Sequence, residues 1–146
     1  MQVSVKTFDQ LTTEELYHIL RLRSEVFVVE QDCVYQDVDN KDQKALHVIG
    51  VKNDEIVAYT RIFKPGDYFE NVSIGRVVVR HDQRKYGLGK QIMQASLATI
   101  DERFPNKPIE ISAQTYLLQF YTDLGFNAFG EEYLEYGIPH RRMLKE

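Results

Sequence analysis

The feature that constrains the fold most is a run of β-branched residues that stops at a basic glycine turn and is followed at once by a helical segment. The run is Ile74-Gly-Arg-Val-Val-Val-Arg80, and the turn is Arg84-Lys-Tyr-Gly-Leu-Gly-Lys90. A strand that feeds a turn at a helix N-terminus leaves free backbone N–H groups at the positive end of the helix dipole, where an anion binds. Without a Cβ, Gly87 and Gly89 let a phosphate approach the backbone. The turn is therefore predicted to hold a pyrophosphate.

Two common phosphate-binding loops do not match this turn. The dinucleotide-binding pattern needs a third glycine where Ile92 stands, and the Walker pattern needs serine or threonine where Gln91 stands. A basic turn that only caps a helix is the alternative interpretation. Arg84 and Lys85 favour an anion site, because both can add charge-assisted hydrogen bonds.

Composition restricts the classes of function. A length of 146 residues is typical of one domain, 1–146, and the net charge of −4 argues against a general nucleic-acid binder. No apolar run approaches about 18 residues, and the acidic N-terminus is unlike a signal peptide, so no association with a membrane is expected. Cys33 is the one cysteine, which suits the cytoplasm. No histidine or cysteine pair has the spacing of metal ligands, so no metal is expected.

Alternating and amphipathic patterns predict a mixed α+β (α/β) fold. A capping box at Thr12 opens an amphipathic helix, and Gly125 ends a shorter one. Strands are predicted at 3–7, 45–51, 56–63, 109–113, 126–132 and 141–145, and one more in the run that ends at 80. Two helices are predicted to begin at 12 and 87, and a third to cover 116–124. Residues 31–44 are predicted to form a long loop or a short irregular helix. The order predicts a central mixed, mostly antiparallel sheet of about seven strands flanked by helices.

This order and two motifs resemble the GNAT superfamily of acyl-CoA-dependent N-acetyltransferases over almost the whole chain. Arg84-x-x-Gly87-x-Gly89 matches the loop that holds the coenzyme A pyrophosphate in that family, and Phe120-Tyr-Thr-Asp-Leu-Gly-Phe126 matches its F-Y-x-x-L-G-F segment. Val26-Phe-Val-Val-Glu-Gln31 and Tyr136-Gly-Ile-Pro-His140 are similar to the ElaA-like branch. The resemblance implies a GNAT-like domain, with acetyl-CoA as cosubstrate and direct transfer of the acetyl group to an amine of a small molecule or protein.

The resemblance also implies roles for individual residues. Tyr121 would protonate the departing thiolate, which needs little help because the pKa of a free thiol is about 8.5. Gln114 would touch the cofactor, although many relatives have asparagine there. The other cofactor-binding residues would be Val77, Val78 and Val79, through their backbone, and Arg84, Lys85, Tyr86, Gly87, Leu88, Gly89 and Lys90, around the pyrophosphate.

The general base is not identified by the resemblance. Many relatives carry a glutamate on the strand before the cofactor loop, but residues 73–79 include no carboxylate. Glu110 on the next strand is one candidate for the base. His47 is another, with a half-buried, hydrogen-bonded histidine as the simpler interpretation. His140 either shapes the C-terminal turn or approaches the acceptor.

Charged residues elsewhere allow two interpretations. Glu30, Asp39 and Asp42 either line the acceptor site, where carboxylates would favour a cationic amine, or form a solvated acidic loop. Arg76 lies inside an apolar strand, where an unpaired charge would be costly, and is expected to pair with a carboxylate.

Two other functions compete with acetyl transfer. One is an acyltransferase with a different acyl group, because residues 21–27 bear a faint likeness to acyl-homoserine-lactone synthases. The other is a non-catalytic acyl-CoA-binding sensor or interaction module, which the missing strand carboxylate would suit. Strand exchange or edge pairing between two sheets would make a homodimer.

Overall fold

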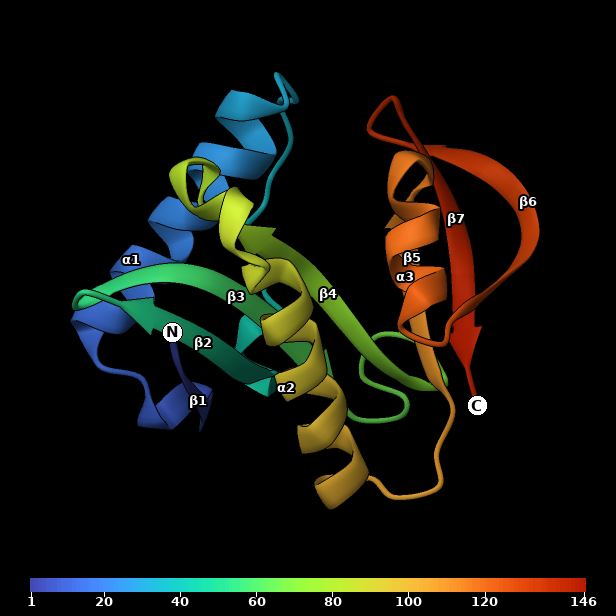
Figure 1. Cartoon of the computed structure of the whole chain (residues 1–146), viewed down its shortest axis with the longest axis horizontal. Helices are drawn as coiled ribbons and strands as arrows, with labels where there is room; N and C mark the ends of the chain where they lie inside the picture. The colour runs from blue at the N-terminus through green and yellow to red at the C-terminus, as the bar shows by residue number, and fades with distance from the viewer.

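The computed structural model describes residues 1–146, and its elements follow the order predicted from the sequence (Figure 1). The strands are β1 Gln2–Thr7, β2 Leu46–Lys52, β3 Glu55–Phe63, β4 Val72–Val79, β5 Ile109–Gln114, β6 Asn127–Glu135 and β7 Ile138–Lys145. The α-helices are α1 Thr13–Arg23, α2 Leu88–Arg103 and α3 Leu118–Asp123. A π-helical turn, η2 Ser24–Glu30, extends α1, and the 3-10 turns are η1 Phe8–Gln10, η3 Asp42–Lys44, η4 His81–Tyr86 and η5 Thr115–Leu117. None of the helices has the length and apolar character that a membrane crossing requires.

The seven strands form one sheet in the order β1-β2-β3-β4-β5-β7-β6. Only β4 and β5 run parallel, and every other neighbouring pair is antiparallel, which confirms the predicted mixed sheet. The last strand begins at Ile138, three residues before the predicted start at 141. The reason is a two-residue turn in which both Tyr136 and Gly137 have positive φ, the geometry that closes a tight hairpin.

Helices cover both faces of the sheet, so the molecule has two cores. On one face α2 contributes Ile92, Met93 and Ile100, which pack with residues of β3, β4 and β5 and with Phe126. On the other face α1 and η2 contribute Ile19, Leu22 and Val26, which pack on Ile49, Tyr59 and Val78. Figure 1 shows α2 in front of the strands and α1 behind them. The part of the sheet as far as β4 is therefore packed against helices on both faces.

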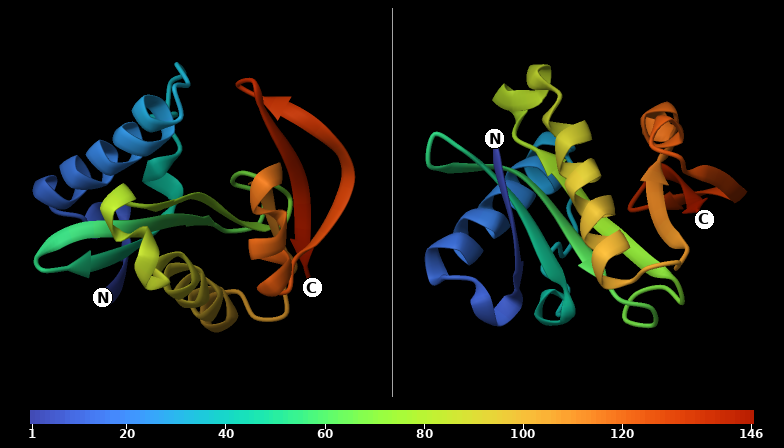
Figure 2. Two further views of the ribbon diagram at one scale, coloured as in Figure 1. Left: turned by 45° about the horizontal axis from the view of Figure 1, so that its top comes forward. Right: turned by 60° about the horizontal axis from the view of Figure 1, so that its bottom comes forward.

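A β-bulge interrupts β4 at Arg76. Ala58 of β3 pairs with Val79 and Arg61 pairs with Gly75, so β4 uses one residue more than β3 over the same stretch. Arg76 has a φ of 52°, in the left-handed region where a bulge can place its extra residue. Parallel pairing of β4 with β5 is limited to Val72–Ile109 and Ser73–Glu110. Beyond these pairs the two strands diverge, as Figures 1 and 2 show.

A buried network of arginines and aspartates holds residues 31–44 against the bulge. Arg76 donates from Nε to Asp37 at 2.7 Å, and Arg23 donates from Nε to the other oxygen of Asp37 at 2.9 Å. Arg23 and Arg61 both donate to Oδ1 of Asp42 at 2.8 Å. This pairing confirms the expectation for Arg76. It also means that four separate segments of the chain, α1, residues 37–42, β3 and β4, meet through largely buried charges.

Asp42→Ala tests the strength of this network. Arg23 is 0% exposed and Arg61 is 1% exposed, so loss of the shared carboxylate leaves two buried guanidinium groups with one partner fewer. The free energy of unfolding is expected to fall by about 3 kcal/mol, as measured by urea denaturation. Asp101→Ala, at an exposed position on α2, is the control and should change it by less than about 0.5 kcal/mol. Equal effects of the two substitutions would contradict a structural role for the network.

Candidate functional site

A cleft of about 690 Å³ opens where β4 and β5 diverge. Val77, Val78 and Val79 line one wall, and Ser112 and Gln114 of β5 line the opposite wall. The start of α2 closes one end, while residues 31–41 and the β6–β7 turn close the other. Arg84, Gly87, Gly89 and Lys90 lie at the end beside α2, and Tyr35, Tyr136 and Glu135 lie at the far end.

The end beside α2 has the properties of an anion site. Gly87 adopts a φ of 70° and precedes the helix, whose N-terminus has no side-chain cap. The first hydrogen bond within the helix runs from the N–H of Gln91 to the carbonyl of Gly87, so the earlier N–H groups have no partner in the helix. A Cβ at Gly89 would lie 3.6 Å from Phe120, in ordinary contact, so its absence widens the cleft beside this ring.

The cleft brings together most of the predicted cofactor-binding residues, though not all of them. Those that line it are Val77, Val78, Val79, Arg84, Gly87, Gly89, Lys90 and Gln114. Leu88 instead faces the core and is 4% exposed. Tyr86 points to solvent with Lys52 Nζ 4.0 Å from its ring centre, and Lys85 is exposed outside the cleft. The binding role of each residue is still a prediction.

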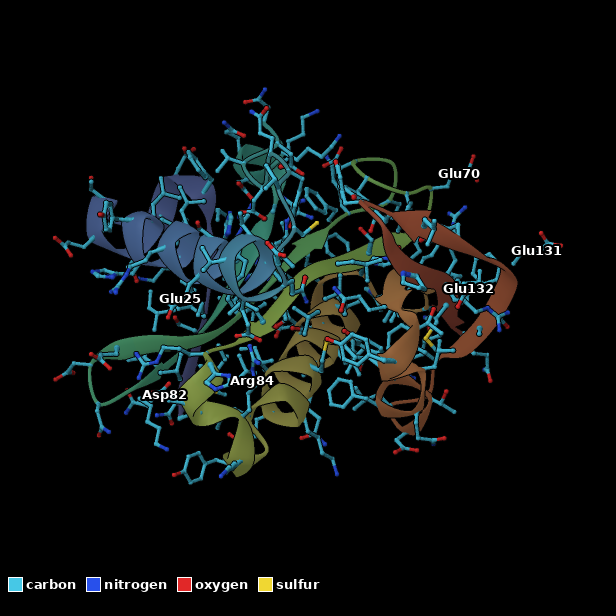
Figure 3. All side chains as sticks on the ribbon, turned by 90° about the horizontal axis from the view of Figure 1, so that it is seen from above. Glu25, Glu70, Asp82, Arg84, Glu131 and Glu132 are labelled. Atoms are coloured by element: carbon cyan, nitrogen blue, oxygen red, sulfur yellow. The ribbon has the colours of Figure 1, made fainter.

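Arg84 lies at the mouth of this anion site but already has a partner. Its two terminal nitrogens donate to the two carboxylate oxygens of Glu30, the longer bond being 2.9 Å, and its Nε donates to the carbonyl of Val79 at 3.0 Å. Figure 3 shows Arg84 on η4, beside the first turn of α2. The pair therefore connects the end of η2 to the loop that is predicted to hold the pyrophosphate.

Contacts also cross the cleft at its far end. The side-chain amides of Gln31 and Gln114 exchange two hydrogen bonds of 3.3 Å, and the rings of Tyr35 and Tyr136 stack at 4.5 Å. Residues 31–36 thus reach over to β5 and to the β6–β7 turn. Sequence patterns did not indicate that Tyr35 and Tyr136 stack, because no motif relates two tyrosines that lie so far apart in the chain.

Tyr121 lies in the wall of the cleft and is 6% exposed. It stands on α3, whose short helix packs it between Phe120 and Phe126. Burial raises the pKa of the Tyr121 hydroxyl well above its usual value, with a smaller effect from Tyr116. The hydroxyl therefore keeps its proton at neutral pH and is available as a donor in the cleft.

The two candidates for the general base lie outside the cleft. Glu110 is 4% exposed, forms an ion pair with Arg142 of β7 and accepts a hydrogen bond from Asn71 at 3.2 Å. These contacts favour a role in holding β5 against β7, and the base role of Glu110 is still a prediction. His47 is fully buried between the hydroxyl of Tyr59, at 2.6 Å, and the carbonyl of Asp42, at 2.9 Å. Burial lowers the pKa of His47. Its two hydrogen bonds agree with the simpler interpretation, although the ring is fully buried and not half-buried.

Of the three acidic residues of the acceptor region, Glu30 and Asp39 line the cleft, as one of the interpretations expected, whereas Asp42 does not. Asp42 is buried in the arginine network, and Glu30 pairs with Arg84. Burial would raise the pKa of Asp39, but hydrogen bonds and charge from Arg61, with Arg76, outweigh it and lower the pKa to about 2. All three are therefore neutralised by arginines. Histidine, cysteine and acidic side chains nowhere gather in groups of three that could hold a metal ion.

Known proteins match both the sequence and the structure. The model of the acetyltransferase (GNAT) domain matches residues 7–146. Protein ElaA of Escherichia coli is 45% identical over 139 residues, which cover 94% of this chain and 91% of ElaA, and its crystal structure superposes with a TM-score of 0.93 over 99% of both chains at 42% identity. An acyl-CoA N-acyltransferase from Pseudomonas aeruginosa superposes with a TM-score of 0.94 over 100% of both chains at 38% identity.

A more distant match bears on one of the competing functions. A CoA-dependent acyl-homoserine lactone synthase shares the fold with a TM-score of 0.77, over 97% of this chain and 81% of the synthase. At 17% identity, this likeness concerns the fold alone. The family model and the two closer relatives agree with the GNAT fold, the cleft between diverging strands and the glycine turn at α2, and the chain is therefore a GNAT-family acyltransferase similar to ElaA.

Proposed function

We propose that the protein is an acetyl-CoA-dependent N-acetyltransferase that transfers an acetyl group directly to a primary amine of a small molecule or protein. The observation that carries the proposal is the cleft that runs from the uncapped start of α2, along the unpaired edge of β4, to the aromatic and acidic far end. A ligand in this cleft can hold phosphates at one end and present a reactive group at the other.

Coenzyme A fits this arrangement chemically. Its pyrophosphate would accept hydrogen bonds from the first N–H groups of α2 and from Arg84 and Lys90, at the helix end that favours anions. The amides of its pantetheine arm would pair with the backbone of Val77 and Val79, since the edge of β4 that faces β5 has no partner strand there. A Cβ at Gly89 would narrow the cleft beside Phe120. The thioester would then lie close to Tyr121.

The transfer requires a neutral amine and a leaving thiolate. The lone pair of the amine attacks the thioester carbonyl, and the tetrahedral intermediate collapses with cleavage of the C–S bond. Tyr121, which keeps its proton because it is buried, donates that proton to the thiolate. We place this reaction in the cytoplasm, which agrees with Cys33 as the one cysteine and with its being unpaired.

Two alternatives make different predictions for the same assays. A non-catalytic acyl-CoA sensor would bind acetyl-CoA but would not turn it over with amines. An acyltransferase with a different acyl group would bind and use longer acyl-CoA esters in preference to acetyl-CoA. A panel of n-butylamine, spermidine and a lysine-containing peptide, assayed with acetyl-CoA and with hexanoyl-CoA, separates these functions from acetyl transfer.

Calorimetric titration of acetyl-CoA into the protein and into Gly89→Val tests the cofactor site. Saturable one-site binding is expected for the parent protein and none for Gly89→Val, because the valine methyl groups would occupy space beside Phe120 that the phosphates need. The fold should survive, since a Cβ at this position makes only ordinary contacts, and thermal unfolding checks this. Gly89→Ala, with one added methyl group, should weaken binding less than Gly89→Val. Unchanged affinity in Gly89→Val would rule out the predicted phosphate site.

Tyr121→Phe tests the proton donor. The ring keeps its packing between Phe120 and Phe126, so affinity for acetyl-CoA should change little. Turnover should fall by roughly tenfold to one hundredfold, at the low end of the range for general acids because a thiolate leaves readily. Steady-state rates and calorimetry on one preparation measure both quantities. Normal turnover in this variant would remove Tyr121 from the reaction.

Glu30→Gln tests the pair that holds Arg84. Loss of the carboxylate frees the guanidinium for the pyrophosphate and removes a negative charge near it, so acetyl-CoA should bind about two- to fivefold more tightly. This increase in affinity should be smaller at high salt, because Glu30 and Arg84 are both partly exposed. Glu25→Gln, an exposed site on η2 that is labelled in Figure 3, is the matched control. Weaker binding in Glu30→Gln would mean that Glu30 positions Arg84 for the ligand instead of competing with it.

A further inference from the structure

Three carboxylates line the cleft: Glu30, Asp39 and Glu135. They differ in the kind of basic residue that pairs with them. Arginines hold the first two, and an arginine stays charged throughout the physiological pH range. Glu135 instead contacts His140, with Oε2 3.2 Å from Nε2. Glu135 is therefore the cleft carboxylate whose partner has a ring nitrogen that can accept a proton.

The orientation of His140 is fixed by its other ring nitrogen. Nδ1 lies 2.7 Å from the carbonyl oxygen of Ile138, and because a carbonyl can only accept, Nδ1 carries the proton. In the neutral ring the lone pair is thus on Nε2 and faces a carboxylate oxygen of Glu135, so these two acceptors need a donor between them, and a bound ammonium group can donate to both. The ring is 6% exposed, stacks on Tyr133 at 6.0 Å and pairs across the sheet with Gln114 of β5. It lines the same cleft as Tyr121.

We propose that Glu135 and His140 receive the acceptor amine: Glu135 binds the incoming ammonium group and His140 Nε2 takes its proton. This inference rests on the proposed acetyl transfer and assigns the base that the sequence left open. The acceptor is accordingly a primary amine that arrives as a cation. Its remaining parts face the stacked rings of Tyr35 and Tyr136, so a flat or apolar group next to the amine is favoured.

The protons and electrons of the reaction balance with these groups. One N–H bond of the ammonium breaks, its proton goes to Nε2 of His140, and the electron pair stays on nitrogen and forms the bond to the thioester carbon. The C–S bond then breaks, and the thiolate takes the proton of Tyr121. The second amine proton returns to the Tyr121 phenolate, and the third stays on the amide. The products are the amide, coenzyme A and an imidazolium ion, which forms an ion pair with Glu135 until solvent takes the proton.

The experiment compares His140→Asn and Glu135→Gln with the parent protein, using acetyl-CoA and the amine of the panel with the highest kcat/KM. Asparagine can still donate to the carbonyl of Ile138 but has no group in place of Nε2. We expect His140→Asn to lower kcat at pH 7 by at least about 100-fold, and the deficit to shrink towards pH 10, where the amine loses its proton without help. Glu135→Gln should mainly raise the KM for the amine, about tenfold. Glu131→Gln, exposed on the same strand as Figure 3 shows, is the matched control.

The possible outcomes distinguish failure of this inference from failure of the proposed function. Calorimetry with acetyl-CoA should give the same affinity for all of these variants, which shows that the cofactor site is intact. A loss in His140→Asn that is equal at all pH values, or no loss, would overturn the inference while acetyl transfer stands. The same would follow if Glu110→Gln showed the deficit that high pH relieves. A parent protein that binds acetyl-CoA but acetylates no amine would overturn the proposed function, and this inference with it.

Discussion

The ion pair between Arg76 and Asp37 fixes the point at which the sheet divides. Arg76 is the extra residue of the bulge in β4, and its positive φ is a conformation that a non-glycine residue adopts only with support from its surroundings. Asp37 supplies this support, because it accepts hydrogen bonds from Arg76 and from the buried Arg23. The bulge lies three residues beyond Ser73, the last residue of β4 that pairs with β5, and after it Val77, Val78 and Val79 line the cleft.

The same network determines which carboxylates at the far end of the cleft are paired with arginines. Arg23, Arg61 and Arg76 neutralise Asp37, Asp39 and Asp42, and these ion pairs hold the stretch against the sheet. Glu135, on a separate strand, is left with a histidine partner. Charges with structural roles are therefore paired with arginines, and the charge with a proposed role in catalysis is paired with a histidine, whose ring nitrogen can accept a proton.

The sequence predicted the parts of the fold and of the site that local patterns determine. Alternation located β2, β3 and β5, the capping box located the start of α1, and the glycine turn located the start of α2. The two-residue turn at Tyr136 was missed, because tyrosine is uncommon at positive φ and a proline in the following residues disfavours a strand. Motifs indicated the cofactor end of the cleft, because the residues of the glycine turn are continuous in sequence. The far end is assembled from segments that lie far apart in the sequence, and pairs such as Gln31 with Gln114 follow from tertiary packing alone.

The unpaired edge of β4 has a consequence for the behaviour of the chain among other proteins. An open row of backbone N–H and C=O groups is a template on which a foreign strand can add, and proteins usually cover or interrupt such edges to avoid aggregation. Here the edge lies in the middle of the sheet, and β5, α3 and residues 31–36 stand around it. A narrow extended chain with amide groups can reach it, whereas a second protein with bulky side chains on both faces cannot. The binding edge is thus also protected against unwanted self-association.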